Sequence, residues 1–425
     1  MNDKFFIRGG YVFIPQDKIL KKLNLEIGEG QVKRITDSAS TEGEVTIIEA
    51  ENKLISPGLV DLHAHLREPG REDTETLESG AWAALAGGFT TVCAMPNTCP
   101  PTDTREQAAF IKKRSEELGL ARILPIGTVT KKREGVEIAE YGLLAEGGIV
   151  AVSDDGDWVA SAEVMRRALE YAGMLGLPVI THAEEPSMCT EGVMNEGTVS
   201  AKLGLRVRPP VAEEIAIARD IALASYTESH LHVAHLTTAK GVEQVRQARS
   251  QGINVTAEAT PHHLLLTDEE LCKFDSSYKV NPPLRTENDR LALIAGLKDG
   301  TIQAIATDHA PHALAEKEQE LDVAPAGMIG LQTALSVLWE RLINSRVLAA
   351  EKLLSLLSVD ASAIIDEKLE LKEGEEANLF VFDPQQTWTF DASTNRSLSC
   401  NSPWFGRTLK GKVQNVFLRA RHFEF

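Results

Sequence analysis

The feature that most constrains this chain is a repeat of an amphipathic stretch, a glycine and a short apolar run. Glycine just past the last helical residue commonly ends a helix, and each apolar run has the length of a buried strand. The sequence contains eight such apolar runs, at residues 54–60, 89–95, 123–129, 149–152, 178–181, 231–236, 253–257 and 302–306, and the run at 231–236 lacks the glycine. This alternation is typical of an α/β protein built as a (β/α)8 TIM-type barrel. A doubly wound sheet is the alternative, but no G-x-G-x-x-G motif follows any run.

The stretches between the apolar runs predict the helices. Thr104 and Gln107 have the spacing of a capping box, which predicts a helix that ends near Leu118. Other amphipathic stretches predict helices at 162–175, 211–225, 239–250 and 288–298, with further helical segments at 325–343 and 349–357.

Both ends of the chain consist of short apolar runs punctuated by Gly and Pro, without helical periodicity. We expect these ends to pair into one small β-sandwich domain. The predicted boundaries are 1–53 for the N-terminal part of this domain, 54–368 for the barrel and 369–425 for the C-terminal part.

Composition excludes several classes of function. The net charge of −18 argues against nucleic acid or an anionic membrane as a partner. The five cysteines are scattered without a C-x-x-C pair, so neither a disulfide framework nor a thiolate zinc site is indicated. No signal-peptide core or membrane-length apolar run is present, which predicts a cytoplasmic protein.

The ends of the predicted strands carry the residues that suggest chemistry. His63 and His65 follow the first run and project to the same side, as two imidazole ligands of one metal ion would. Later strand ends add Asp154, Asp155, His182, His235 and Asp308, which together could serve a pair of zinc-like ions. A satisfied buried histidine or a helix-capping aspartate is the alternative for each residue taken alone. His230 and His232 share the opposite strand face from His235, and we interpret them, like His422, as structural.

Three motifs resemble those of one family. The segments D-L-H-A-H-L-R-E-P-G at 61–70, M-P-N-T at 95–98 and A-T-D-H-A-P-H-x-x-x-x-K at 306–317 resemble type I dihydroorotases of the amidohydrolase superfamily. The resemblance covers essentially the whole chain. It implies a metal-dependent cyclic amidohydrolase that interconverts N-carbamoyl-L-aspartate and L-dihydroorotate in de novo pyrimidine biosynthesis.

The resemblance also implies a ligand set for two divalent ions, with zinc as the natural choice. His63, His65 and Asp308 would bind one ion, and His182 and His235 the other. Many relatives bridge the ions with a carboxylated lysine, but residues 148–156 contain none, and Asp155 would bridge instead. A hydroxide shared by the ions would attack the ring carbonyl, with Asp308 as general acid and base.

The substrate carboxylate needs a cation and hydrogen-bond donors, and Arg67 offers a bidentate guanidinium. By resemblance, Asn97 and His312 share this carboxylate, Asn281 contacts the ring, and the backbone of Ala326 and Gly327 completes the pocket. The charged segment 313–323 predicts a mobile loop beside the site, in the position of a lid.

Two rival functions are considered. Hydantoinases, dihydropyrimidinases and allantoinases share the H-x-H motif but usually need the bridging lysine, and lack the joint Arg67, Asn97 and His312 set. A non-catalytic scaffold for aspartate transcarbamoylase would typically have lost metal ligands, which are all present here. The family resemblance further predicts a homodimer, and it makes an aspartate transcarbamoylase a candidate partner.

Overall fold

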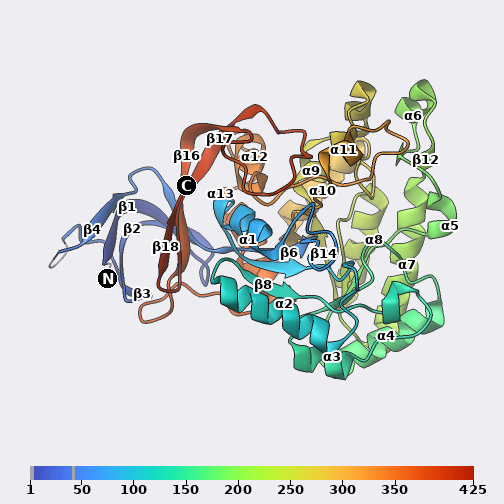
Figure 1. Cartoon of the computed structure of the whole chain (residues 1–425), viewed down its shortest axis with the longest axis horizontal. Helices are drawn as coiled ribbons and strands as arrows, with labels where there is room; N and C mark the ends of the chain where they lie inside the picture. The colour runs from blue at the N-terminus through green and yellow to red at the C-terminus, as the bar shows by residue number, and fades with distance from the viewer. Residues whose placement is uncertain (1–3, 41–43) are drawn as a thin grey trace.

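The computed structural model describes residues 4–40 and 44–425, and in this part of the chain both ends contribute strands to one sheet (Figure 1). Its eight strands are β1 (Phe5–Ile14), β2 (Ile19–Gly28), β3 (Gln31–Thr36), β4 (Thr46–Glu49), β5 (Leu54–Pro57), β16 (Asn378–Phe390), β17 (Arg407–Leu418) and β18 (Arg421–Glu424). Their order is β18-β17-β16-β5-β1-β2-β3, with β4 paired to β1. The expected sheet from both chain ends is therefore present.

The predicted strand 54–60 is wrong in one respect, because the structure divides it between two sheets. β5 pairs with β1 and β16 in the sheet of the chain ends, whereas β6 (Leu59–Ala64) belongs to a parallel sheet. The chain crosses between them at Gly58, where an added Cβ would lie 1.9 Å from Thr90 Oγ1. Only glycine fits this close approach, so the break falls there.

The middle of the chain forms parallel strands. They are β6, β7 (Phe89–Ala94), β8 (Arg122–Pro125), β9 (Val152–Ser153), β10 (Val179–Thr181), β13 (Leu231–Val233), β14 (Val255–Ala259) and β15 (Ala304–Ile305). One sheet has the order β6-β7-β8 and the other β15-β14-β13-β10-β9. Parallel bridges from Gly127 to Val152 and from Ala64 to His309 link the two sheets at both edges. A separate pair is β11 (Met194–Asn195) with β12 (Val207–Arg208).

Helices connect these strands. They include α1 (Leu77–Ala86), α2 (Arg105–Leu118), α3 (Tyr141–Gly147), α4 (Ala162–Met174), α7 (Pro210–Thr227), α8 (Ala239–Ser250), α10 (Glu287–Asp299), α13 (Ala350–Leu357) and α14 (Val359–Ile364). The remaining ones are α5 (Pro186–Cys189), α6 (Thr198–Leu203), α9 (Pro261–Leu265), α11 (Leu314–Lys317), α12 (Ala334–Leu338), the 3₁₀ turns 131–133, 268–273 and 276–278, and a π-helical turn at 339–343.

The helix predictions succeed where a cap and an amphipathic face coincide. The hydroxyl of Thr104 accepts the Gln107 N–H at the start of α2, as the capping pattern predicts. The prediction of a helix over 325–343 is wrong at its start, because α12 begins at Ala334. Ala326 and Gly327 instead line a cavity, and Pro325 and Ala326 are only half-buried.

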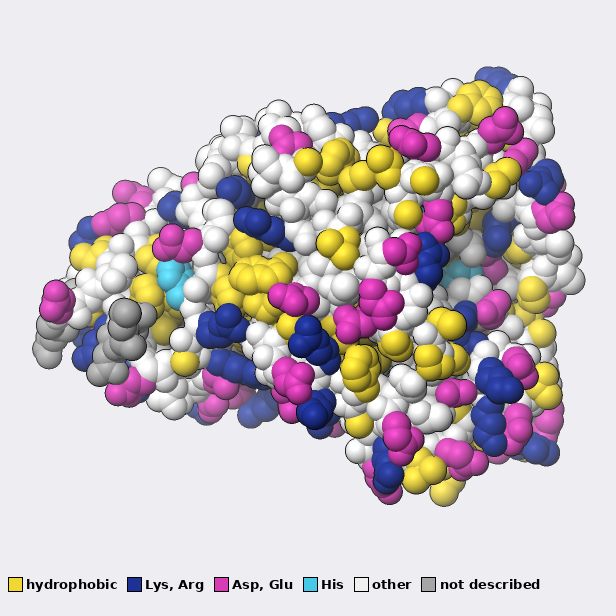
Figure 2. All heavy atoms as spheres, viewed as in Figure 1, with side chains coloured by type: hydrophobic (Ala, Val, Ile, Leu, Met, Phe, Trp, Pro, Cys, Tyr) yellow, Lys and Arg dark blue, Asp and Glu magenta, His cyan; other side chains and the backbone are white. Residues whose placement is uncertain are grey.

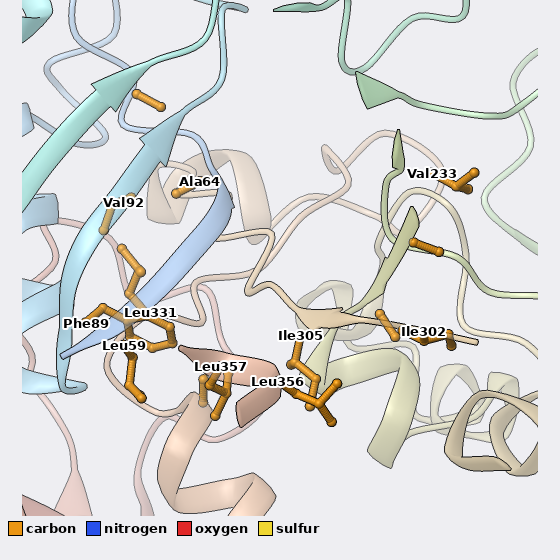
Figure 3. Close-up of a cluster of buried hydrophobic side chains, with 14 of the residues drawn as sticks. Leu59, Ala64, Phe89, Val92, Val233, Ile302, Ile305, Leu331, Leu356 and Leu357 are labelled. Carbon is orange, nitrogen blue, oxygen red and sulfur yellow. The ribbon is translucent and has the colours of Figure 1, made fainter. Parts of the chain in front are cut away.

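The core occupies both faces of the parallel strands. Leu59 and Phe89 pack in a large cluster with Leu356 and Leu357 of α13 (Figure 3). The next residue along β6, Val60, faces the opposite way and belongs to a second cluster that includes Ile364 of α14. Strands buried on both faces are rigid supports for the side chains at their ends.

The surface is mixed in charge. Acidic and basic side chains are interspersed over the face seen in Figure 2, although the whole chain is acidic. Within the described residues, no helix combines the length and apolarity needed to span a membrane.

Candidate metal and substrate site

The end of β6 presents the two histidines of the H-x-H motif. Both side chains are buried, and they turn to the same side of the strand as expected. The Nδ1 of His63 lies 2.9 Å from Glu258 Oε1, which leaves its Nε2 3.3 Å from Asp155 Oδ1. The Nε2 of His65 lies 3.1 Å from Asp308 Oδ1. One nitrogen of each ring is therefore directed at carboxylates.

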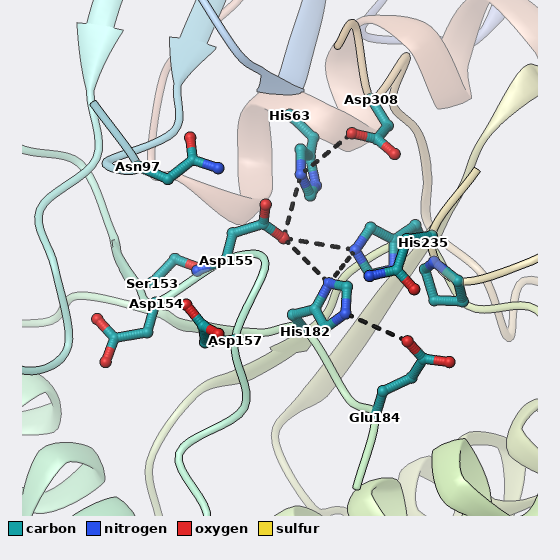
Figure 4. A network of polar contacts seen from close by, with 12 residues as sticks. His63, Asn97, Ser153, Asp154, Asp155, Asp157, His182, Glu184, His235 and Asp308 are labelled. Atoms are coloured by element: carbon teal, nitrogen blue, oxygen red, sulfur yellow. Dashed lines mark hydrogen bonds and ion pairs between the residues drawn. The ribbon is translucent and has the colours of Figure 1, made fainter. Parts of the chain in front are cut away.

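Asp155 lies at the centre of the cluster (Figure 4). Its carboxylate is 3.5 Å from His182 Nδ1, 3.4 Å from His235 Nε2 and 3.4 Å from His65 Nε2. The neighbouring Asp154 points away and accepts hydrogen bonds from Val129 and Thr130 instead. Adjacent aspartates thus have separate tasks, one in the cluster and one fixing the loop after β8.

Asp308 lies beside a hydrogen-bonded neighbour and has an unusual backbone conformation. Its neighbour Thr307 donates to Asp61 through both its N–H (2.8 Å) and its hydroxyl (2.6 Å). Asp308 has φ 47° and His235 has φ 31°, a left-handed region that non-glycine residues rarely adopt. Such backbone strain persists where the surrounding structure holds it, and it commonly marks functional sites.

The cluster fits a metal ion. Two groups of donor atoms, His63–His65–Asp155 and Asp155–His182–His235, each lie within 4.8 Å of one another and could hold a cation. His63 Nε2 and Asp155 Oδ1 are buried without a hydrogen-bond partner. A buried polar atom left unpaired is costly, and a divalent cation would satisfy both atoms.

The electrostatics agree with this fit. Burial opposes the charged form of Asp155, but the histidines, led by His63, hold its pKa well below the usual range. Burial likewise opposes protonation of His182, but hydrogen bonds to Asp155 and Glu184 raise its pKa to about 9. The carboxylates therefore attract positive charge strongly, which a metal ion could supply in place of protons.

A cavity of about 200 Å³ opens onto the cluster. Its walls contain eleven of the twelve predicted site residues, and the twelfth, His63, lies behind them. The lining residues are His65, Arg67, Asn97, Asp155, Gly156, His182, His235, Asn281, Asp308, Ala310, His312, Ala326 and Gly327. The structure thus brings the predicted metal ligands and the predicted substrate contacts into one cavity.

Arg67 and Asn97 lie beside the histidine pair. The Arg67 Nε donates to the Pro311 carbonyl at 3.1 Å, and burial lowers the pKa of this guanidinium to about 10, so it stays charged. Asn97 Oδ1 lies 2.8 Å from His65 Nδ1. Burial lowers the pKa of His312 to about 3, which keeps this imidazole neutral near pH 7. The charged Arg67 side chain therefore lies at a fixed position in the cavity, beside the histidine–aspartate cluster.

Sequence reasoning missed Glu258, which lies in β14 one residue beyond the predicted run. Its carboxylate lies 2.9 Å from His63 Nδ1 and 3.2 Å from His232 Nε2, and it is fully buried. The sequence signal that could have identified Glu258 is its place directly after the apolar run 253–257. His230 and His232 both contact Thr256, in keeping with their structural interpretation.

A second missed group connects the cluster to Asn281. Glu184 lies 3.5 Å from His182 Nε2, and Arg208 Nη1 donates to Glu184 at 2.6 Å. The same Arg208 nitrogen donates to Asn281 Oδ1 at 2.5 Å. No spacing in the sequence links these three positions, because Glu184 and Asn281 come from separate loops and Arg208 from the short strand β12.

Solved structures define the class of the fold. An L-hydantoinase from Arthrobacter aurescens matches with a TM-score of 0.86 and 23% identity, covering 99% of this chain and 96% of that chain. A dihydropyrimidinase from Brevibacillus agri matches with a TM-score of 0.83 and 23% identity, covering 99% and 94%. The protein therefore has the fold of the cyclic amidohydrolases.

Sequence relatives give the family. A "Dihydro-orotase-like" family model matches residues 52–241. A dihydroorotase from Pelobacter propionicus is 45% identical over 416 residues, covering 98% of both chains. One from Aquifex aeolicus is 43% identical over 411 residues, covering 96% of both. The chain belongs to the dihydroorotase family.

Proposed function

We propose that this protein is a dihydroorotase, which interconverts N-carbamoyl-L-aspartate and L-dihydroorotate in de novo pyrimidine biosynthesis. The observation that carries the proposal is the single cavity that joins a histidine–aspartate cluster to Arg67, Asn97 and His312. The cluster suits amide chemistry, and the arginine suits a substrate that bears a ring carboxylate.

We assign His63, His65 and Asp308 to one divalent ion and His182 and His235 to a second, and Asp155, which belongs to both groups of donor atoms, would serve both ions. Imidazole and carboxylate ligands favour zinc. When bound, the ions would lower the pKa of a shared water and polarise the ring carbonyl. Glu258 would fix the ring of His63 by accepting its Nδ1–H, which leaves Nε2 for the metal.

The side chains of the chain then have distinct tasks. Asp308 holds the proton released from the attacking water and delivers it to the leaving ring nitrogen, and acts in reverse during cyclisation. Arg67 binds the substrate carboxylate, with Asn97 and His312 beside it. Asn281, set by Arg208, contacts the ring, and the backbone of Ala326 and Gly327 closes the wall.

We further propose that the eight parallel strands close into a (β/α)8 barrel. The bridges Gly127–Val152 and Ala64–His309, which join the two parallel sheets at both edges, support this closure. The sheet of the chain ends would form the small β-sandwich domain, from residues 1–53 and 369–425, with β5 added to it. The barrel would then span the remainder of 54–368.

The nearest competing activity is hydrolysis of a hydantoin or dihydropyrimidine, because proteins of those names share the fold. The bridging position favours dihydroorotase over this alternative, since the residue at the centre of the cluster is Asp155 rather than a lysine. Lys131, one of two adjacent lysines after β8, pairs with Glu137 instead.

The deciding experiment measures ring opening of L-dihydroorotate by the purified protein, together with a metal count and an Asp308→Ala variant. We expect turnover with about two ions per chain, reduced ~10²–10⁴-fold in the variant, because that is the usual contribution of a general acid or base. Metal without turnover would redirect the assay to hydantoin, dihydrouracil and allantoin. Absence of both metal and turnover would instead favour a non-catalytic scaffold for aspartate transcarbamoylase.

The resemblance also supports proposals about location and partners. We propose a cytoplasmic enzyme, in keeping with five cysteines that are all free in the structure. We propose a homodimer and association with an aspartate transcarbamoylase. Light scattering of the pure protein, alone and mixed with the transcarbamoylase of the same organism, tests both.

A further inference from the structure

The lysine that ends the third family motif, Lys317, has no part in the mechanism above. It ends α11, is 6% exposed, and directs its ammonium group inward. The Nζ donates to the Pro325 carbonyl at 2.9 Å and to the Gly327 carbonyl at 3.0 Å. No carboxylate among the described residues lies within ion-pair distance of it. An ammonium buried against backbone carbonyls alone is an expensive arrangement.

The carbonyls that Lys317 holds belong to the wall of the cavity. Ala326 and Gly327 line the cavity together with Arg67 and His312, and His312 Nε2 lies 2.9 Å from the Ala326 carbonyl. Gly327 has φ 132°, and an added Cβ would lie 2.9 Å from His312 Nε2. Small shifts of this backbone would therefore move the face against which His312 is set.

Asn401, from the C-terminal segment, supports the same wall. Its Nδ2 donates to the Gly327 carbonyl at 3.1 Å, and its Oδ1 accepts the His312 N–H at 3.1 Å. Lys317 and Asn401 thus converge on one carbonyl from different parts of the chain. Lys317 lies within the segment 313–323 that was predicted as a mobile loop, and its hydrogen bonds fix that segment. The hydroxyl of Ser276 also donates to the Lys317 carbonyl.

We propose that Lys317 is a positioning residue for the substrate carboxylate, holding the 325–327 backbone so that His312 and Arg67 face the carboxylate together. The inference rests on the proposed dihydroorotase function. Burial, together with nearby Lys279, lowers the pKa of Lys317 to about 7. A titratable group that is buried beside a cavity, with a strongly shifted pKa, commonly has a functional role.

A second buried lysine provides a matched control. Lys279 is 8% exposed, and its Nζ donates to the Leu321 carbonyl at 2.6 Å and to the Asp322 carbonyl at 3.3 Å. It fastens the same segment, but its ammonium group does not bond to residues 325–327. Lys279→Met therefore removes a similar buried cation without releasing the cavity wall.

The experiment compares the holoenzyme with Lys317→Met and Lys279→Met, measuring KM and kcat for L-dihydroorotate, metal content and Tm. We expect both variants to lose thermal stability and keep their metal. Lys317→Met should raise KM ~10-fold with a smaller change in kcat, as loss of a charge-assisted hydrogen bond would. Lys279→Met should keep KM within ~2-fold, and Lys317→Arg, which keeps the charge, should recover part of the loss.

Turnover by the wild type with an unchanged KM in Lys317→Met would overturn this inference and leave the proposed function intact. Equal rises of KM in both lysine variants would also overturn it, because they would indicate a general loosening. Absence of turnover in the wild type would overturn the proposed function and this inference with it. If Lys317→Met does not fold, Lys317→Gln replaces it, and an unchanged KM there overturns the inference.

Discussion

The cavity has two halves that are built differently. The histidine–aspartate half comes from the ends of parallel strands, with His63 on β6, His65 directly after it, and Asp155, His182 and His235 just after later strands. The opposite half consists of loop backbone at Ala326 and Gly327, held by side chains from elsewhere in the chain. One half depends on strand register, and the other on tertiary hydrogen bonds.

Because of this difference, substitutions in the two halves of the cavity should have different effects. Strand ends are fixed by ladders buried on both faces, so substitutions there change chemistry more than position. The loop half is fixed by a few donors on single carbonyls, so losing one donor moves the wall. Variants in the first half should therefore affect metal and turnover, whereas those in the second should affect substrate binding.

The largest effect should come from Asp155→Asn. The amide cannot bridge two cations as a carboxylate does, so we expect loss of at least one of about two ions per chain and of turnover. Metal analysis after dialysis measures the loss. Asp154→Asn is the control, because Asp154 binds the Val129 and Thr130 amides instead. Equal metal loss in both variants would contradict the assignment of Asp155.

A smaller effect should follow Glu258→Gln. The variant keeps the shape of the side chain but loses the charge that orients His63, and metal affinity should fall ~10–100-fold. Competition with a chelating dye measures this affinity. Glu75→Gln is the matched control: Glu75 is also a buried carboxylate bound to a histidine, with its Oε2 3.1 Å from His309 Nε2. Metal affinity should be unchanged there, and a comparable fall would refute a specific role for Glu258.

The smallest effect on activity should come from His422→Phe in the sheet of the chain ends. His422 stacks on Phe417 with ring centroids 4.5 Å apart, and its Nε2 lies 2.8 Å from Asn415 Oδ1. Phenylalanine keeps the stacking and loses the hydrogen bond, so unfolding in urea should become ~0.5–1.5 kcal/mol easier. kcat/KM should be unchanged, and a change would show that this sheet influences the cavity.

The sequence predicted most of the site because strand ends are visible in it. Alternating side chains place His63 and His65 on one side without any tertiary information, and glycine stops precede most of the strands. The proposed substrate contacts Asn281, Ala326 and Gly327 were reached through the family resemblance. Their loops have no periodicity, and the helix predicted from Pro325 begins only at Ala334.

The amino-acid sequence by itself determined the α/β alternation, the sheet-forming chain ends and the placing of ligand-type residues at strand ends, whereas the family resemblance selected the members of the histidine–aspartate cluster. Those features depend on local periodicity, which neighbouring residues encode. Only the tertiary structure decided that Glu258 orients His63, that Arg208 sets Asn281, and that Lys317 and Asn401 share one carbonyl. Each of these contacts joins residues far apart in the chain or on different loops, and no local pattern records which carbonyl a distant side chain will reach.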